Sequence, residues 1–402
     1  MDGAAAERGA SADGGAGAEG GADADAGAGA AAGDPGTAAG GAAAAAGGAA
    51  AERPDRRVRR VRLSDVAERA NVSTSTASRA LNGIGELSDD TRAAVIRAAE
   101  ELDFRPSPAA RSLRTRRSHT VGLVVPTVAH AFYAAVTTGA QAALQQSGYR
   151  LILVDSGEDP QSVTEAVRTL LDHEVDGLLV STAPFGAEQF NELLGTTPCV
   201  FIDELAPGAG AGNVVLENGR GIELLVDHVV EHGHTRIAYL GGPKDRTSGY
   251  ERQAAFIQAM ERHGLPVTDE LITQCEWTIT SGFEGAAQIL AAEPQPTALV
   301  TASGELGLGA LAAARRARRA IPDDLALVVF DDLYFAPLLE PSLTGIAYDA
   351  RAIGHEGARL LLGVVGNEGN TEREVRIDVS LVRRRSCGCD YDPGTELAEA
   401  VA

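Results

Sequence analysis

Residues 61–117 read VRLSDVAERANVSTSTASRALNGIGELSDDTRAAVIRAAEELDFRPSPAARSLRTRR, and the pattern of this stretch decides how the whole chain is interpreted. It predicts three short helices followed by a basic segment. Leu63 and Ser64 have the form of a hydrophobic staple residue and an N-cap, so we expect a first helix that begins there and closes at Asn71.

A second helix is expected from about Thr74 to Leu81. Ser73 precedes it as an N-cap, and Gly83 follows it where a left-handed residue closes a helix. Two helices separated by a three-residue turn have the spacing of a helix-turn-helix, whose second helix lies in the major groove of DNA. The apolar side chains expected to hold the two helices together are Val66, Ala77 and Leu81.

The segments LSDVAERANVSTSTASRALNG (63–83) and TRAAVIRAAEELDFRPSPAARSLR (91–114) resemble the DNA-binding headpiece of the LacI/GalR family of bacterial transcriptional regulators. We place this headpiece at residues 58–106. The side chains that the resemblance implies as DNA contacts are Thr74, Ser75, Thr76, Ser78 and Arg79. Arg79 would reach toward a guanine, whereas Thr76 and Ser78 would add phosphate contacts.

Residues 107–118 are expected to form a hinge helix and linker, because a Ser-Pro pair begins the segment as a cap and first helical residue. Such a helix is too short to be stable alone in water, so it should fold only when docked. The resemblance implies that two hinge helices, one from each protomer of a homodimer, enter the minor groove and wedge a leucine between base pairs. The groove-contacting residues would be Ala110, Arg111 and Leu113. The alternative is that the segment is only an exposed basic linker.

The overall charge of −21 and the pI near 4.8 are unusual for a DNA-binding protein, whose non-specific affinity comes from neutralising phosphates. The charge is unevenly distributed, however. Residues 56–119 hold 14 Arg against 8 acidic residues, a local charge of +6, which leaves −27 for the rest of the chain. An acidic body of this kind repels DNA and orients the basic end toward it.

The N-terminal residues 1–57 are expected to be a disordered extension. Of residues 1–51, 39 are Ala or Gly, and no Val, Ile, Leu or Phe precedes Val58, so nothing is available to bury. A tolerated extension and a wrongly chosen start codon are both compatible with this composition. The segment has neither a secretory signal nor a membrane span, which favours a cytoplasmic protein. The tail, residues 389–402, is also expected to be disordered and lacks the leucine heptads of a coiled-coil tetramer.

Between these ends, apolar runs alternate with amphipathic segments. The runs that predict buried parallel strands are 120–126, 149–155, 175–181, 199–203, 235–242, 297–303 and 325–332. The segments that predict helices are 132–147, 161–173, 219–232, 248–263, 282–292 and 307–319. This alternation predicts an α/β fold of doubly wound parallel sheets, and residues 119–388 are long enough for two lobes.

The motifs VGLVVP, VDGLLV, PCVFID and LVVFDD of this region resemble the effector domain of the LacI/GalR family, itself similar to periplasmic sugar-binding proteins. The resemblance implies two lobes that serve for effector binding and dimerisation. The chain would cross between them near 216–221, near 343–347 and at about 375. A ligand would lie in the cleft, outside the carboxyl ends of the strands.

The same resemblance indicates Arg252 and Asp331 as effector contacts. An arginine fork donates to hydroxyl or ring oxygens and a carboxylate accepts from vicinal hydroxyls, so the pair suits a sugar or polyol. Alternatively, Asp331 caps a helix and Arg252 forms a surface ion pair. The further candidate residues are Phe132, Tyr133, Trp277 and Ser303. The aromatic side chains could stack on a sugar, although a lone Trp is often a core residue, and Ser303 replaces a usual Asn with a single hydroxyl.

Other chemistry is weakly supported. His228, His232 and His234 have a spacing that could bind a metal, but histidines near a helix C-terminus also interact favourably with its dipole. Cys387 and Cys389 form a single C-x-C without a second pair, so free thiols are the simpler interpretation. We therefore expect no metal, no cofactor and no catalytic set.

These observations together favour a regulator of transcription. We expect a repressor, not an enzyme, that binds a palindromic double-stranded DNA operator as a homodimer. A small-molecule effector, a sugar or related polyol, would control it, and no membrane partner is expected. The alternative is a sugar-binding receptor protein without DNA function.

Overall fold

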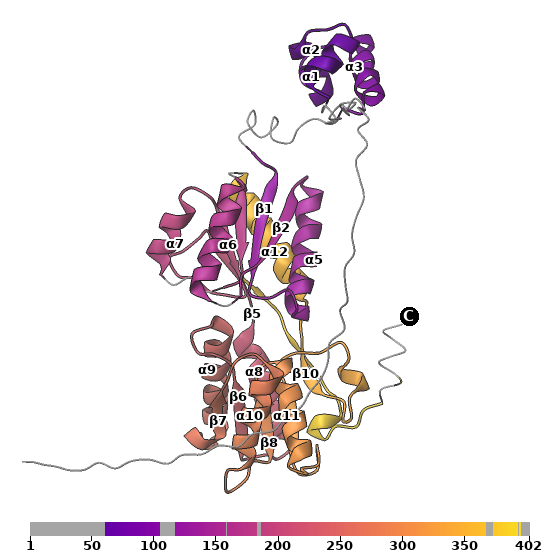
Figure 1. The fold of residues 1–402 in the computed structure, drawn as a ribbon. Coiled ribbons are helices and arrows are strands. Elements are labelled where there is room, and N and C mark those ends of the chain that lie inside the picture. The colour runs from indigo at the N-terminus through magenta and orange to yellow at the C-terminus, as the bar shows by residue number, and fades with distance from the viewer. Residues whose placement is uncertain are drawn as a thin grey trace, which may run out of the picture. The chain divides into compact units, whose positions relative to one another are not determined.

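The computed structural model describes residues 61–104, 117–157, 159–182, 186–366, 373–392 and 394. The first described segment is a three-helix unit of α1 (Leu63–Arg69), α2 (Thr74–Asn82) and α3 (Asp89–Glu101), shown in indigo in Figure 1. Val66, Ala77 and Val95, one from each helix, are fully buried and form its centre. The predicted hinge contacts Ala110, Arg111 and Leu113 lie outside the described residues.

The ends of the first two helices only partly follow the prediction. Ser64 is wrong as the N-cap of α1, because Arg62 holds that position and its backbone N–H donates to the Asp65 carboxylate at 2.9 Å. A carboxylate three residues into a helix can satisfy the cap N–H in this way, so Ser64 becomes part of the first turn. The prediction for α2 is confirmed: the Ser73 hydroxyl accepts the Thr76 N–H at 3.1 Å, and Gly83 has a φ of 68°.

The rest of the described chain forms two α/β lobes, as predicted (Figure 1). In the described residues the first lobe has a six-stranded sheet of order β11-β5-β4-β3-β1-β2. Its strands are β1 (Thr120–Val125), β2 (Arg150–Asp155), β3 (Gly177–Val180), β4 (Cys199–Ile202), β5 (Gly212–Leu216) and β11 (Glu374–Ile377). Its helices are α5 (Ala131–Gln146), α6 (Pro160–Asp172), α7 (Ala187–Leu194) and α12 (Ala350–Val365).

The second lobe repeats this arrangement. Among the described residues its sheet has six strands in the order β12-β10-β9-β8-β6-β7. The strands are β6 (Ile237–Gly241), β7 (Ile272–Gln274), β8 (Ala298–Thr301), β9 (Ala326–Val329), β10 (Thr344–Ala347) and β12 (Ser380–Val382). The helices are α8 (Asn218–Glu231), α9 (Thr247–Arg262), α10 (Ile279–Leu290) and α11 (Gly304–Arg316). The ladders are parallel except for that between β10 and β12.

Most predicted strands are buried on both faces, as strands in the middle of a parallel sheet are. The predicted burial was wrong for β2, because this strand lies at the edge of its sheet and has only exposed and half-buried residues. Its apolar sequence RLILVD therefore leaves Leu153 39% exposed.

The chain crosses between the lobes at three places within the described residues. It passes from β5 to α8 at Glu217, from β10 to α12 at residues 348–349, and from β11 to β12 at residues 378–379. The predicted crossings near 216–221, 343–347 and 375 fall at or within a few residues of these points. Three crossings between two sheets place the carboxyl ends of both sets of strands around a shared cleft.

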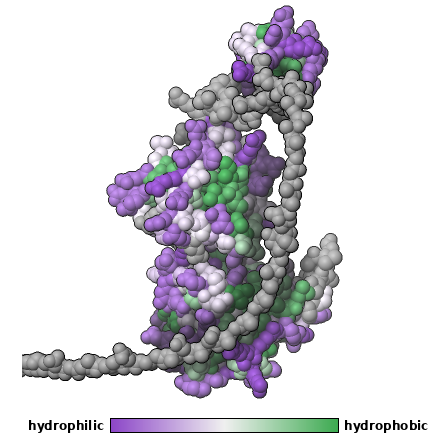
Figure 2. All heavy atoms as spheres, in the orientation of Figure 1, coloured by the Kyte–Doolittle hydropathy of each residue, from purple (hydrophilic) through white to green (hydrophobic). Residues whose placement is uncertain are grey.

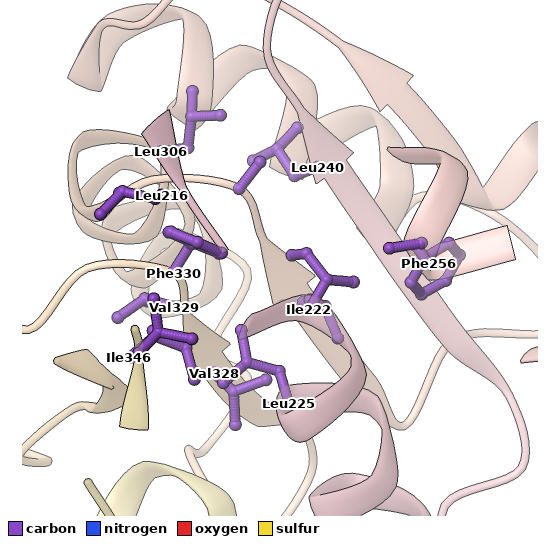
Figure 3. Packing of buried hydrophobic residues seen from close by; sticks show 14 of the residues in the cluster. Leu216, Ile222, Leu225, Leu240, Phe256, Leu306, Val328, Val329, Phe330 and Ile346 are labelled. Atoms are coloured by element: carbon purple, nitrogen blue, oxygen red, sulfur yellow. The ribbon is translucent and has the colours of Figure 1, made fainter. Parts of the chain in front are cut away.

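Helix α8 is fixed firmly on the second sheet. Figure 3 shows Ile222 and Leu225 of α8 beside Val328 of β9 and Ile346 of β10, and all four side chains are fully buried. The same packing fixes Asn218, the first residue of α8, whose buried side chain accepts a hydrogen bond from Arg252.

Candidate functional site

The exposed side of α2 carries the predicted DNA contacts. Thr74, Ser75 and Arg79 are exposed and Ser78 is half-buried. At about 100° per residue, these four side chains share an arc of about 140° of the helix. Thr76 lies beyond that arc, and its hydroxyl is 2.8 Å from the Ser73 hydroxyl, so it takes part in the cap of the helix.

The net positive charge of this region comes from the segments that flank the three helices. Residues 61–104 contain 5 Arg and 8 acidic residues, whereas the 9 Arg of residues 56–60 and 105–119 have no acidic neighbours within those segments. Phosphate neutralisation would therefore come mainly from the two flanks, and α2 would supply uncharged base contacts together with Arg79.

A cavity between the two lobes contains most of the predicted effector contacts. It has an empty volume of about 580 Å³, which includes the open space at its mouth. Its lining consists of Thr127, His130, Phe132, Tyr133, Asp203, Ser248, Arg252, Trp277, Asp331 and Tyr348. Phe132, Tyr133, Arg252, Trp277 and Asp331 were predicted from the sequence.

Arg252 is the buried cation of the cavity. Its side chain on α9 is 5% exposed, and its guanidinium carbon lies 3.5 Å from the centre of the Phe330 ring. Nε donates to Asn218 Oδ1 at 2.8 Å, and one terminal nitrogen donates to the carbonyl of Ala302 at 2.6 Å. In the described part of the chain these bonds use two of its five N–H donors, so others remain for a ligand.

Asp331 is oriented by both of its oxygens. Oδ2 accepts the backbone N–H of Gly304, the first residue of α11, at 2.7 Å, and Oδ1 accepts the Tyr348 hydroxyl at 2.5 Å. A carboxylate at a helix N-terminus also interacts favourably with the helix dipole. The carboxylate is thus held in one orientation at the carboxyl end of β9, where its remaining lone pairs can accept from a ligand.

Asp203 is a second carboxyl group in the lining, at the end of β4. Burial and the adjacent Glu204 raise the pKa of Asp203 to about 7, although the Arg252 guanidinium opposes the rise. Burial and Asp203 also raise the pKa of Tyr133 well above its usual range, so the phenol stays protonated. The cavity can therefore both donate and accept hydrogen bonds near neutral pH.

Polar contacts join the two lobes at the rim of the cavity. His130, the N-cap of α5, places Nε2 2.7 Å from the Glu305 carboxylate of α11. Burial opposes protonation of His130, but the hydrogen bond to Glu305 and the nearby carboxylates outweigh it and raise the pKa of His130 above 6.5. On another side of the rim, the Thr247 N–H donates to Glu204 at 3.0 Å.

Aromatic rings form the apolar part of the wall. Phe132 packs edge-on against Tyr133 and Tyr348, with ring centres 5.0 and 6.2 Å apart. Trp277 is half-buried and lies against the backbone of Gly242, where any side chain would collide with its ring. Flat apolar surfaces beside fixed polar groups suit the C–H faces and hydroxyls of a sugar ring.

Ser303 is not among the residues that line this cavity. Its hydroxyl accepts the Leu306 N–H at 3.2 Å, so Ser303 is the N-cap of α11. Asp203 could have been found from the sequence, because it follows a buried strand as Asp331 does. Ser248 lies one helical turn before Arg252 and could also have been inferred. Tyr348 follows a short strand and has no comparable signal.

Two protein-family models match this chain, one over the three-helix unit and the other over part of the two lobes. The model described as bacterial regulatory proteins, lacI family, matches residues 62–107, and that of the periplasmic binding protein-like domain matches residues 226–387. The HTH-type transcriptional repressor PurR of Klebsiella pneumoniae (strain 342) is 31% identical over 81% of this chain and 96% of its own. The ribose operon repressor of Escherichia coli (strain K12) is 29% identical over 81% of this chain and 99% of its own.

Solved structures agree with this comparison. A lac repressor dimer bound to operator and the anti-inducer ONPF is similar with a TM-score of 0.75 and 26% identity, over 81% of this chain and 99% of the repressor chain. The transcriptional regulator CelR in complex with cellobiose is similar with a TM-score of 0.62 and 29% identity, over 81% of this chain and all of its own. None of the helices in the described part of the chain is both long and apolar enough to cross a membrane.

Proposed function

Since this chain belongs to the lacI family of bacterial regulatory proteins, we propose that it is a transcriptional repressor whose affinity for operator DNA is set by a small ligand in the interlobe cavity. Within this proposal residues 58–106 bind DNA, residues 107–118 form the hinge, and residues 119–388 bind the ligand and dimerise. Access to chromosomal DNA requires that the protein act in the cytoplasm.

Sequence recognition is assigned to the exposed face of α2. Thr74, Ser75 and Ser78 would contact base edges or phosphates, and Arg79 would donate to a guanine. Thr76 acts in the cap, so its contribution would be limited to a phosphate contact. The hinge residues Ala110, Arg111 and Leu113 would add minor-groove contacts, with the leucine as a wedge.

The ligand is proposed to be a sugar or a related polyol. The observation that carries this proposal is the convergence of Arg252, Asp331 and Asp203 on one cavity that also has aromatic walls. The guanidinium donates, the fixed carboxylate accepts, and Asp203 can do either near neutral pH. Rings such as Phe132 and Trp277 would cover the apolar face of the ligand.

Coupling between ligand and DNA would pass through the relative position of the two lobes. The cavity takes residues from both lobes, and His130–Glu305 and Glu204–Thr247 already join them at its rim. A ligand that contacts both sides favours the lobe arrangement in which those contacts are made. That arrangement would change how the two hinge segments of a dimer approach the DNA.

Dimerisation is proposed to use the edge of the first lobe. Figure 2 shows hydrophobic residues gathered on this lobe over β2 and α5, and Leu153 of β2 is 39% exposed. A strand of apolar residues at an open sheet edge needs a partner surface. A two-fold dimer built there would match a palindromic operator.

The ligand assignment can be tested on the full-length protein. Its melting temperature would be measured with separate additions of pentoses, hexoses, disaccharides, nucleosides and purine bases. A ligand at 100 times its dissociation constant should stabilise the protein by about 2.7 kcal/mol, which raises the melting temperature by several degrees. The same compound should change the affinity for operator DNA.

The test variant is Asp331→Asn, which removes the fixed carboxylate. The control variant is Asp172→Asn, which changes an exposed carboxyl group at the end of α6. Asp331→Asn should weaken the response at least about tenfold in ligand concentration, because one charged hydrogen bond is lost. Asp172→Asn should respond as the parent protein does. If both variants responded to the same ligand concentrations, the ligand would bind at a site other than this cavity.

A further inference from the structure

Two histidines and two cysteines, far apart in sequence, meet on the second lobe away from the ligand cavity. One ligand-type atom from each of His228, His232, Cys387 and Cys389 lies within 4.8 Å of the other three. Cys387 Sγ is 3.2 Å from His228 Nε2, and Cys389 Sγ is 3.5 Å from the same nitrogen and 3.3 Å from His232 Nε2. Because 159 residues separate His228 from Cys387, the sequence pattern alone did not connect the two pairs.

The histidines are presented by the end of α8. His228 lies in the last turn of the helix and His232 is its C-cap, so a spacing of four residues places both rings on one face. The rings are 4.8 Å apart between centres and nearly perpendicular. The well-packed body of α8 therefore holds both rings before any ion arrives.

The cysteines are presented by a tight turn near the C-terminal end of the second lobe. Cys387 ends the 3-10 helix η3 (Arg385–Cys387), and Gly388 follows with a φ of 96°. A left-handed residue between two cysteines turns the chain back, which brings Cys389 to the same side as Cys387. Glycine is suited to this position because it lacks the Cβ that makes such a φ costly.

The surroundings resemble those of a metal site. His228 and Cys387 are 4% and 2% exposed, and the Thr344 hydroxyl is 3.0 Å from Cys387 Sγ. Nδ1 of His228 is buried and has no hydrogen-bond partner in the described part of the chain, and the Glu231 carboxylate lies 4.0 Å away. Metal-bound histidines usually donate their second N–H to a carboxylate, and Glu231 can supply one after a small side-chain rotation.

We propose that His228, His232, Cys387 and Cys389 bind one Zn²⁺ ion as a structural site. Zinc takes four such ligands in a tetrahedron, with bonds of about 2.3 Å to sulfur and about 2.0–2.1 Å to nitrogen, which puts neighbouring sulfur and nitrogen ligands about 3.5 Å apart. Three of the four sulfur–nitrogen distances already lie at 3.2–3.5 Å, and the fourth is within 4.8 Å. Two thiolates also balance the charge of Zn²⁺, so the complex is neutral and suits a partly buried position.

The set of ligands argues against other ions and other roles. Ca²⁺ and Mg²⁺ prefer oxygen ligands, whereas thiolate and imidazole together select zinc. Four protein ligands leave no position for water or substrate, so the ion would stabilise the fold and would do no chemistry. At about 1.5 Å per residue, most of the length of α8 separates the site from Asn218, which is bonded to the cavity residue Arg252, so the ion is not the effector.

The site would fasten the C-terminal segment to the second lobe. This segment is already held by Ser386, whose hydroxyl donates to the Leu327 carbonyl at 2.5 Å, and by Arg384, which pairs with Asp332 at 2.7 Å. Asp332 adjoins the ligand contact Asp331. Zinc would close a long loop of chain and help to hold Arg384 against Asp332.

The test uses untagged full-length protein produced with zinc in the growth medium. Elemental analysis should find one zinc per chain, and removal by a chelator should lower the melting temperature. Refilling with Co²⁺ should give the strong visible absorption of tetrahedral cobalt together with a thiolate charge-transfer band. Absence of stoichiometric zinc, or a weak spectrum of octahedral cobalt, would overturn the proposal.

Two ligand variants and two controls complete the test. Cys389→Ser and His232→Gln change the more exposed ligands, so the fold should survive. Each should weaken metal affinity at least about a hundredfold. Cys275→Ser and His234→Gln change a thiol and an imidazole outside the cluster and should bind zinc like the parent protein. Unchanged metal affinity in both ligand variants would contradict the assignment.

Discussion

Asp203 makes both the stability of the protein and the hydrogen bonding in the cavity depend on pH. Its pKa of about 7, against an ordinary value of 3.8, means that between these pH values the folded protein holds a proton that the unfolded chain has released. Stability therefore falls as pH rises through this window, because the folded state must finally carry a buried charge. Above pH 7 the ionised group is a charged and therefore stronger acceptor, so a ligand hydroxyl that donates to it should bind more tightly.

The first prediction concerns Asp203→Asn. The amide removes the buried charge, so the free energy of unfolding of the variant relative to the parent should increase by about 2–3 kcal/mol between pH 5 and pH 8. Urea unfolding at several pH values measures this difference. A difference that does not change with pH would mean that Asp203 is already ionised at pH 5.

Arg79 is the residue on which the proposed base recognition depends most. Arg79→Ala should cost about 1–3 kcal/mol of operator binding and relax the preference at one base pair, because a bidentate contact to guanine is lost. Fluorescence anisotropy with the operator and its single-base variants measures both effects. The control Arg97→Ala removes an equal charge from the exposed side of α3 and should leave the base preference intact. Equal losses on every base variant with Arg79→Ala would make Arg79 a phosphate contact.

At the scale of elements, α5 and α12 come into backbone contact in the first lobe. A Cβ on Gly354 would lie 1.9 Å from the carbonyl oxygen of Val136, and one on Gly139 would lie 1.9 Å from that of Arg351. Neither helix can move away easily, since α12 follows one interlobe crossing and α5 begins at the cavity with His130. Glycines at these positions therefore set the position of the helix that carries Phe132 and Tyr133.

Gly354→Ala should lower the free energy of unfolding by about 2 kcal/mol, because the overlap with α5 outweighs the better helix propensity of alanine. The control is Gly219→Ala in α8, where the nearest atom, Cβ of Ala255, is 3.8 Å from the new Cβ. This control should be neutral or stabilised by up to about 1 kcal/mol. Similar stability of the two variants in urea unfolding would mean that the helices separate at little cost.

The elements that the sequence predicted are those with a strong local signal. Long apolar runs such as 120–126 and 325–332 identified the central strands, and Ser73 with Gly83 identified both ends of α2. The edge position of β2 was missed because burial on one or both faces depends on sheet order, which local periodicity does not contain. The short strands β7, β11 and β12 have too few residues to show a period.

Local sequence patterns are also limited in predicting functional sites, because residues far apart in the sequence form them. Asp331 and Arg252 were found through resemblance and chemistry, and Asp203 could have been found by the rule that ligands lie at the carboxyl ends of strands. The histidine–cysteine cluster could not, since its two halves come from α8 and from the end of the chain, and only the folded lobe brings them together. Ser303 was selected for its position after β8, but a serine there also caps a helix.

At the scale of the whole molecule, the positive charge that attracts DNA and the cavity that would hold a ligand belong to separate regions of the chain. The arginines that flank the three-helix unit provide attraction to phosphates, while the acidic remainder of the chain disfavours contact elsewhere along the DNA. In the proposed account, specific binding then depends on α2 and the hinge of two protomers acting together. A ligand that binds one lobe arrangement about ten-thousand-fold better than the other would move the equilibrium from 1:99 to 99:1.

The central claim is that this chain reads a palindromic operator, and selection of genomic DNA fragments tests it most directly. Purified full-length protein would be mixed with sheared genomic DNA at near-physiological salt, and the retained fragments would be sequenced. We predict enrichment of a palindrome by the parent protein and loss of that enrichment with Arg79→Ala. Retention of unrelated fragments, or of none with and without the sugars and nucleosides of the ligand panel, would contradict the account.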